Sequence, residues 1–236
     1  EGGIVYRLGS GTALPGNMAL GATGDVNNAK IAGEIIGSEL SSLGINTTLA
    51  PVVDVNNNAN NPVIGLRSYG EDAEMVGKMA SAEIEGLAEY NVIGCAKHFP
   101  GHGDTATDSH YGLPMVDKSK EELLNNELKP YQVAINQGIE MIMSAHILYP
   151  QLDNTTVYSE QTKKQEKLPS TLSHKILTNL LKEEMGFKGV VVTDAMNMAG
   201  IAATYDEVQA VKLAINAGVD LICMPTNITC LEDMSK

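Results

Sequence analysis

Apolar residues are spaced along the chain in two ways. In some segments they recur every three or four residues, as Ile31, Ile35 and Leu40 do, which indicates an amphipathic helix. In others they form short, nearly continuous runs rich in β-branched residues, which indicates a buried strand. The predicted helices cover 25–43, 73–90, 118–137, 170–185 and 208–217, and the predicted strands cover 45–55, 92–99, 141–147, 189–196 and 219–225.

This regular alternation of strand and helix predicts an α/β fold built on a parallel sheet. An eight-stranded (β/α)8 barrel and a doubly wound open sheet both fit the pattern. A barrel collects its active site from the carboxyl ends of many strands, whereas an open sheet concentrates it at one switch point. Polar residues stand at the carboxyl ends of several different predicted strands, which favours the barrel, as a single domain over residues 1–236. They are Asp54, Lys97, His98, His146 and Asp194.

Charge and composition exclude several classes of function. With 29 acidic and 16 basic residues the formal charge is −13, which argues against binding a nucleic-acid backbone. The apolar runs are far shorter than the roughly 20 residues of a membrane span. Neither a phosphate-binding loop nor a dinucleotide fingerprint occurs, so no nucleotide cofactor is expected. The three cysteines lack metal-ligand spacing and imply no disulfide framework.

The segment KHFPGHGDTATDSHYGLP, residues 97–114, is unusually rich in chemically active side chains. Three interpretations are open: a metal site, an acid/base loop, and a loop whose histidines only bond the backbone. The metal reading lacks the helical H-x-x-x-H or C-x-x-C pattern that holds two ligands on one face. In an extended segment Asp108 would lie beside His110, where a carboxylate fixes the tautomer of an imidazole and favours its charged form. The metal candidates are His98, His102, Asp104, Asp108 and His110.

Candidate chemistry is also carried by an aspartate, two arginines and a Lys-His pair. Asp194 follows three valines, where a carboxylate is costly to bury unless it is functional or finds partners; it could equally be a helix N-cap. The guanidinium groups of Arg7 and Arg67 could hold sugar hydroxyls or a carboxylate, or form structural ion pairs. Lys97 and its neighbour His98 could both contact a ligand only if the strand is twisted or bulged.

Together with EGGIVYRL, NPVIGLRSYGED and VVVTDAMNM, the segment 97–114 resembles the bacterial β-N-acetylglucosaminidases of glycoside hydrolase family 3 over essentially the whole chain. The resemblance implies a (β/α)8 barrel and a retaining mechanism without metal or cofactor. It implies Asp194 as nucleophile and His110, assisted by Asp108, as acid/base. It also implies that the sugar is held by Arg7, Arg67, Lys97 and His98.

The expected substrate is a small carbohydrate, a terminal β-linked N-acetylglucosamine of muropeptides or other cell-wall fragments. In the family a first barrel strand and a sugar-contacting aspartate precede the Glu-Gly-Gly sequence, so we expect a partial barrel without its first strand. Many Gram-positive relatives also carry a second domain after the barrel. Two alternatives stay open: a phosphorylase, in which phosphate replaces water, and a sugar-binding barrel without catalysis.

Overall fold

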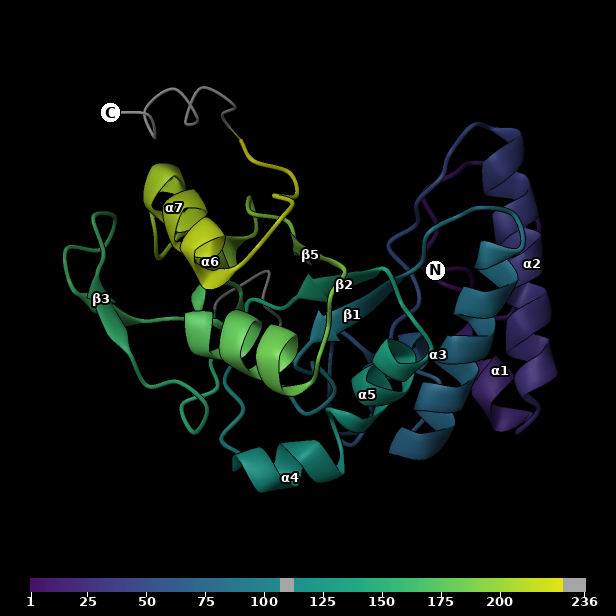
Figure 1. The fold of residues 1–236 in the computed structure, drawn as a ribbon, viewed down its shortest axis with the longest axis horizontal. Coiled ribbons are helices and arrows are strands. Elements are labelled where there is room, and N and C mark those ends of the chain that lie inside the picture. Colours follow the sequence, from purple (N-terminus) through teal and green to yellow (C-terminus); the bar gives the residue numbers. More distant parts are fainter. Residues whose placement is uncertain (107–112, 227–236) are drawn as a thin grey trace.

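The computed structural model of the chain describes residues 1–106 and 113–226. It has a mixed α/β fold in which parallel strands lie between two groups of helices (Figure 1). Strands β1 (Cys95–Phe99), β2 (Met141–Ser144) and β5 (Val190–Thr193) form a parallel sheet in the order β1-β2-β5. Their residues are almost entirely buried, as the continuous apolar runs predict.

Two further predicted strands lie beside this sheet but pair only at isolated positions. The segment 45–55 runs parallel to β1 through the Val52–Lys97 bridge, and 219–225 runs parallel to β5 through the Val192–Leu221 bridge. Pro51 has no N–H to donate, which limits regular pairing of the first segment. Five parallel segments therefore stand side by side in chain order, and among the described residues this order shows no reversal of the kind found at a doubly wound switch point.

Most of the predicted helices are confirmed. Helices α2 (Val26–Ser42), α3 (Ala73–Ala88) and α7 (Glu207–Ala217) begin after Asp25, Asp72 and Asp206, whose carboxylates accept backbone N–H groups of the first turn. The segment 170–185 forms a short 3-10 turn, η2 (Ser170–Leu172), and a π-helix, η3 (Lys175–Glu184). The remaining short elements are α1 (Asn17–Ala22), η1 (Gly65–Arg67) and α6 (Ala199–Ala202).

The single helix predicted over 118–137 is wrong. The structure has two helices there, α4 (Lys120–Asn125) and α5 (Lys129–Asn136). A capping box between Ser119 and Glu122 starts α4. Pro130 cannot donate the hydrogen bond that a helix interior needs, so it sits in the first turn of a new helix.

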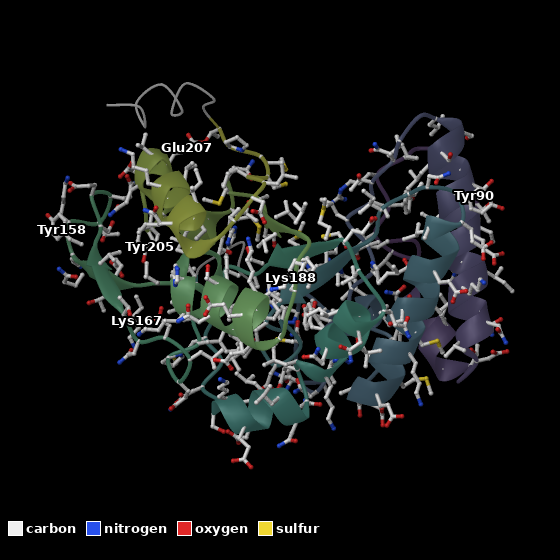
Figure 2. The ribbon with its side chains drawn as sticks, in the orientation of Figure 1. Tyr90, Tyr158, Lys167, Lys188, Tyr205 and Glu207 are labelled. Carbon is white, nitrogen blue, oxygen red and sulfur yellow. The ribbon has the colours of Figure 1, made fainter. Side chains whose placement is uncertain are left out.

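A β-hairpin that the hydrophobic pattern did not predict extends from the C-terminal half of the molecule. Its strands β3 (Thr156–Tyr158) and β4 (Gln165–Lys167) pair antiparallel and are largely exposed. Figure 2 shows Tyr158 and Lys167 on this hairpin and Tyr205 beside it. The Tyr205 hydroxyl donates to the carbonyl of Lys167 at 2.7 Å, and the Gln209 amide donates to that of Tyr158 at 2.6 Å, which joins the hairpin to α7 and the turn before it.

Helices α2 and α3 pack closely at the edge of the sheet (Figure 1). A side chain at Gly33 would lie 2.2 Å from the carbonyl oxygen of Glu83, and one at Gly86 would lie 2.2 Å from that of Lys30. Glycine at these two positions lets the helix backbones touch. Among the described residues, no helix is both long and apolar enough to cross a bilayer.

Candidate active site

The polar residues at the carboxyl ends of the parallel segments come together at the carboxyl edge of the sheet. Parallel pairing places the carboxyl ends of neighbouring strands at one edge, so side chains distant in the sequence become neighbours. Hydrogen bonds and electrostatic interactions connect most of them. The group consists of Asp54, Lys97, His98, His146 and Asp194.

Asp54 is the buried anchor of this group. Its side chain is almost completely inaccessible, and its carboxylate accepts the His98 backbone N–H at 3.2 Å and the His102 backbone N–H at 2.6 Å. The second carboxylate oxygen lies 2.8 Å from Nδ1 of the His98 ring. Asp54 therefore fixes both the backbone and the imidazole of His98.

Lys97 and His98 are sequence neighbours that both contribute buried side chains to the site. The pairing of β1 with β2 shifts register between Ala96 and Phe99, so the regular in-out alternation is interrupted here. Lys97 reaches Glu1 and His98 reaches Asp54. The prediction that the strand is irregular where these two neighbours both make contacts is thus confirmed.

Glu1 joins two of the cations that were predicted to hold a sugar. Its carboxylate accepts two hydrogen bonds from Arg67, at 2.8 and 2.7 Å, and lies 2.5 Å from the ammonium of Lys97. Burial would raise the pKa of Glu1, but these two cations lower it well below its usual value. The buried carboxylate is therefore ionised and sets the positions of Arg67 and Lys97.

Asp194 follows β5 and is partly buried. Its carboxylate accepts the Ala195 N–H at 2.7 Å, and its own N–H donates to Ser144 of β2 at 3.1 Å. Helix α6 starts five residues later behind Met198, so the N-cap interpretation of Asp194 is wrong. Burial raises the pKa of this carboxyl group, and the net effect of its surroundings is nevertheless a pKa below the ordinary value. The largest lowering effects come from the imidazoles of His98 and His146.

His146 bridges the ends of β2 and β5. Its Nε2 lies 3.1 Å from the carbonyl oxygen of Ala195, and its Nδ1 lies 2.9 Å from the Thr171 hydroxyl. A carbonyl oxygen only accepts hydrogen bonds, so Nε2 carries a proton. The ring is buried and holds the residue next to Asp194 in place.

The first part of the 97–114 loop is held by Asn61. The amide of this buried residue donates to the carbonyl oxygens of His102, at 2.7 Å, and Gly103, at 3.0 Å. Its oxygen accepts the N–H groups of Val63 and Ile64, just before Arg67. One side chain thus connects this loop to the segment that carries Arg67.

Lys118 binds acidic residues from two parts of the chain. It lies 2.9 Å from the carboxylate of Asp104 and 2.5 Å from that of the buried Glu127, which also accepts the Asn57 amide at 2.7 Å. Asp104 and Lys118 stand on either side of residues 107–112 in the sequence. The predicted acid/base residues Asp108 and His110 belong to 107–112 and lie outside the described residues.

Arg7 is exposed, unlike the other predicted sugar ligands. It lines a hollow of about 400 Å³ between the first fourteen residues and helix α2. Within 1–106 and 113–226, it forms no ion pair, and no contact joins it to Asp194 or His98. The structure therefore brings together Arg67, Lys97, His98 and Asp194, but not Arg7.

Several residues of the site had no predicted role in it. Asp54 and His146 stand out in the sequence as polar ends of strands, but only the fold reveals that they hold His98 and Ala195. Nothing in the sequence signals that Glu1 binds two cations or that Asn61 joins two loops. In the part of the chain that the structure describes, no three His, Cys, Asp or Glu side chains gather as a metal site would require.

Comparison with known proteins identifies the class to which this fold and site belong. The chain belongs to glycosyl hydrolase family 3: the sequence pattern of the family's N-terminal domain matches residues 1–236. Beta-hexosaminidase A of Pseudoalteromonas piscicida is 44% identical over the whole chain, which spans 40% of that protein.

Two solved structures are also similar. A glycoside hydrolase family 3 beta-N-acetylglucosaminidase from Paenibacillus sp. str. FPU-7 is 46% identical, with a TM-score of 0.89 over 95% of this chain and 41% of that one. The beta-glucoside phosphorylase BglX bound to 2FGlc is 30% identical, with a TM-score of 0.88 over 95% and 41%. The chain spans about two fifths of the length of these relatives.

Proposed function

We propose that the chain forms the catalytic barrel of a retaining β-N-acetylglucosaminidase in which Asp194 is the nucleophile. The observation that carries this proposal is the position of Asp194 at the carboxyl edge of the sheet, where its carboxylate accepts the Ala195 N–H and His146 holds Ala195. Neighbouring imidazoles also lower the pKa of this carboxyl group despite burial. A nucleophile must be ionised at working pH, and this environment keeps it so. The five parallel segments in chain order support the barrel.

The proposed reaction is a double displacement. A carboxylate oxygen of Asp194 bonds to the anomeric carbon while the bond from that carbon to the aglycone oxygen breaks, and His110 gives its proton to the departing oxygen. Water then attacks the same carbon and loses a proton to His110, and the bond to Asp194 breaks. Asp108 orients His110 and favours its charged form. The roles of Asp108 and His110 rest on the sequence alone.

Arg67, Lys97 and His98 are the proposed ligands of the sugar hydroxyls. Glu1 holds the first two cations close together, and Asp54 holds the imidazole. Ordered donors of this kind fix the sugar ring relative to the nucleophile, which is a large part of the catalytic effect of positioning. Arg7 remains a predicted ligand that would have to reach the sugar from the exposed N-terminal segment.

The proposed substrate is a terminal β-linked N-acetylglucosamine, as in N-acetylglucosaminyl-N-acetylmuramic acid from cell-wall fragments. The names of the hexosaminidase and N-acetylglucosaminidase relatives support this sugar. Incubation of the whole protein with that disaccharide should release free N-acetylglucosamine, and proton NMR should detect the β-anomer first because configuration is retained. Initial release of the α-anomer would contradict the retaining mechanism.

A phosphorylase is the second candidate, because a beta-glucoside phosphorylase has a closely similar fold. Phosphorolysis would give a sugar 1-phosphate, whereas hydrolysis gives the free sugar. The same incubation in phosphate buffer separates the two. We expect free N-acetylglucosamine at every phosphate concentration. A yield of sugar 1-phosphate that increases with phosphate concentration would show that the function is phosphorolysis and not hydrolysis.

A further inference from the structure

Asp54 and His98 form a buried carboxylate–imidazole pair beneath the proposed sugar site. The carboxylate oxygen lies 2.8 Å from His98 Nδ1, and both side chains are almost fully inaccessible to solvent. An ionised carboxylate only accepts hydrogen bonds, so Nδ1 must carry the proton. The opposite tautomer would place two lone pairs against each other at this distance.

We infer that Asp54 is a positioning residue that keeps the proton of His98 on Nδ1 and so reserves Nε2 for a hydroxyl of the sugar. This inference rests on the proposed function, since it concerns the sugar that His98 binds. The tautomer of an imidazole is set by the partner of its other nitrogen. When the ring carries a single proton and that proton is on Nδ1, Nε2 accepts a hydroxyl hydrogen, and the other tautomer cannot.

Asp54 also anchors the backbone. The variant that tests its effect on the His98 imidazole must therefore keep this backbone contact. Its other carboxylate oxygen accepts the His102 N–H at 2.6 Å. In Asp54→Asn the amide oxygen can keep this bond, which directs the amide NH₂ toward His98 Nδ1. The NH₂ donates, so Nδ1 becomes an acceptor and the proton moves to Nε2. Asp54→Ala would instead remove the ring partner and the backbone anchor together.

The first measurement is the tautomer itself. The whole protein is labelled with ¹⁵N-histidine, and the His98 signals are assigned by their loss in His98→Gln. We expect a protonated Nδ1 in the wild type and a proton on Nε2 alone in Asp54→Asn. A wild-type His98 with its proton on Nε2 alone would overturn the inference. Because this measurement is made on the wild type, it does not depend on whether Asp54→Asn folds.

The second measurement asks whether Asp54 acts through His98. Inhibition constants for N-acetylglucosamine are measured in the wild type, Asp54→Asn, His98→Ala and the double variant. Asp54→Asn should weaken binding on the order of tenfold, and should weaken it no further when His98 is already alanine. Additive losses in the double variant would mean that Asp54 serves the fold rather than the ring.

Asp153→Asn is the matched control. Asp153 is a buried carboxylate bound by Ser173 and Lys175, and no contact joins it to His98 within the described residues. It should lower thermal stability without changing the His98 tautomer or N-acetylglucosamine binding. If the wild type neither binds nor releases N-acetylglucosamine, the proposed function fails, whereas the tautomer measurement still decides the Asp54–His98 relationship.

Discussion

The imidazole of His146 donates from Nε2 to the carbonyl oxygen of Ala195 at 3.1 Å, directly beside Asp194. His146 follows β2 and Ala195 follows β5, so the bond links the ends of two neighbouring strands. The same imidazole lowers the pKa of the Asp194 carboxyl group. One buried side chain thus affects both the position and the charge of the proposed nucleophile.

His146→Gln should shift the acidic limb of the kcat/KM profile to higher pH. Glutamine keeps an N–H donor but removes the imidazole that favours the ionised form of Asp194, so the pKa of Asp194 rises. Activity that needs this carboxylate ionised is then lost at a higher pH as the solution is acidified. His174→Gln, at an exposed histidine, is the control and should leave the profile unchanged. An unshifted acidic limb in His146→Gln would rule out this effect.

Lys118→Met should destabilise the protein by about 1–3 kcal/mol, because it leaves the buried Glu127 carboxylate without its cation. Chemical denaturation measures this loss. The control, Lys163→Met, breaks an ion pair whose two side chains are 66% and 61% exposed, and should leave the stability close to that of the wild type. Equal losses of unfolding free energy in the two variants would show that the ion pairs of Lys118 stabilise the protein no more than an exposed ion pair does.

Gly103→Ala should disrupt the loop that leads to the predicted acid/base residues. A side chain at Gly103 would lie 1.6 Å from the carbonyl oxygen of Val55, which is backbone and cannot move aside freely. We expect a loss of stability of about 1–3 kcal/mol and a large fall in kcat. Gly9→Ala, where no atom lies within 4 Å of the added group, should behave as the wild type. Normal kcat in Gly103→Ala would mean that this loop can rearrange without cost.

The fold was predictable where the determining signals are local. Helix α2 follows from the spacing of its apolar residues and from the capping carboxylate of Asp25. Strands β2 and β5 follow from their short apolar runs. The hairpin was missed because β3 and β4 are only three residues each, largely exposed, and without a clear apolar alternation. The break before α5 was missed because apolar periodicity continues through it, while Pro130 interrupts the backbone hydrogen bonds.

The site was predictable as a set of residue types at strand ends, but not as a network. Asp54 and His98 are 44 positions apart, and their contact exists only because two parallel segments align. Glu1 and Arg67 are 66 positions apart, and the sequence around either residue gives no indication that the two are in contact. The sequence could therefore suggest Arg67 and His98 as ligands, whereas the carboxylates that orient them required the structure.

His110→Ala should affect substrates with poor leaving groups far more than activated aryl glycosides. An activated aglycone departs with little protonation, so it depends less on a general acid. Asp108→Ala should show the same pattern more weakly, because it acts through the imidazole. The measurement is kcat/KM over a series of aryl N-acetylglucosaminides of rising leaving-group pKa. Equal losses over the series for His110→Ala would exclude it as the proton donor.

Covalent labelling tests most directly the claim that Asp194 attacks the anomeric carbon. A 5-fluoro-N-acetylglucosaminyl fluoride forms a glycosyl-enzyme quickly and releases it slowly, so the modified peptide can be found by digestion and mass spectrometry. We expect one sugar per protein, attached to Asp194, and no label or turnover in Asp194→Ala, with melting still cooperative. A sugar attached to any other carboxylate, or undiminished turnover by Asp194→Ala, would contradict it.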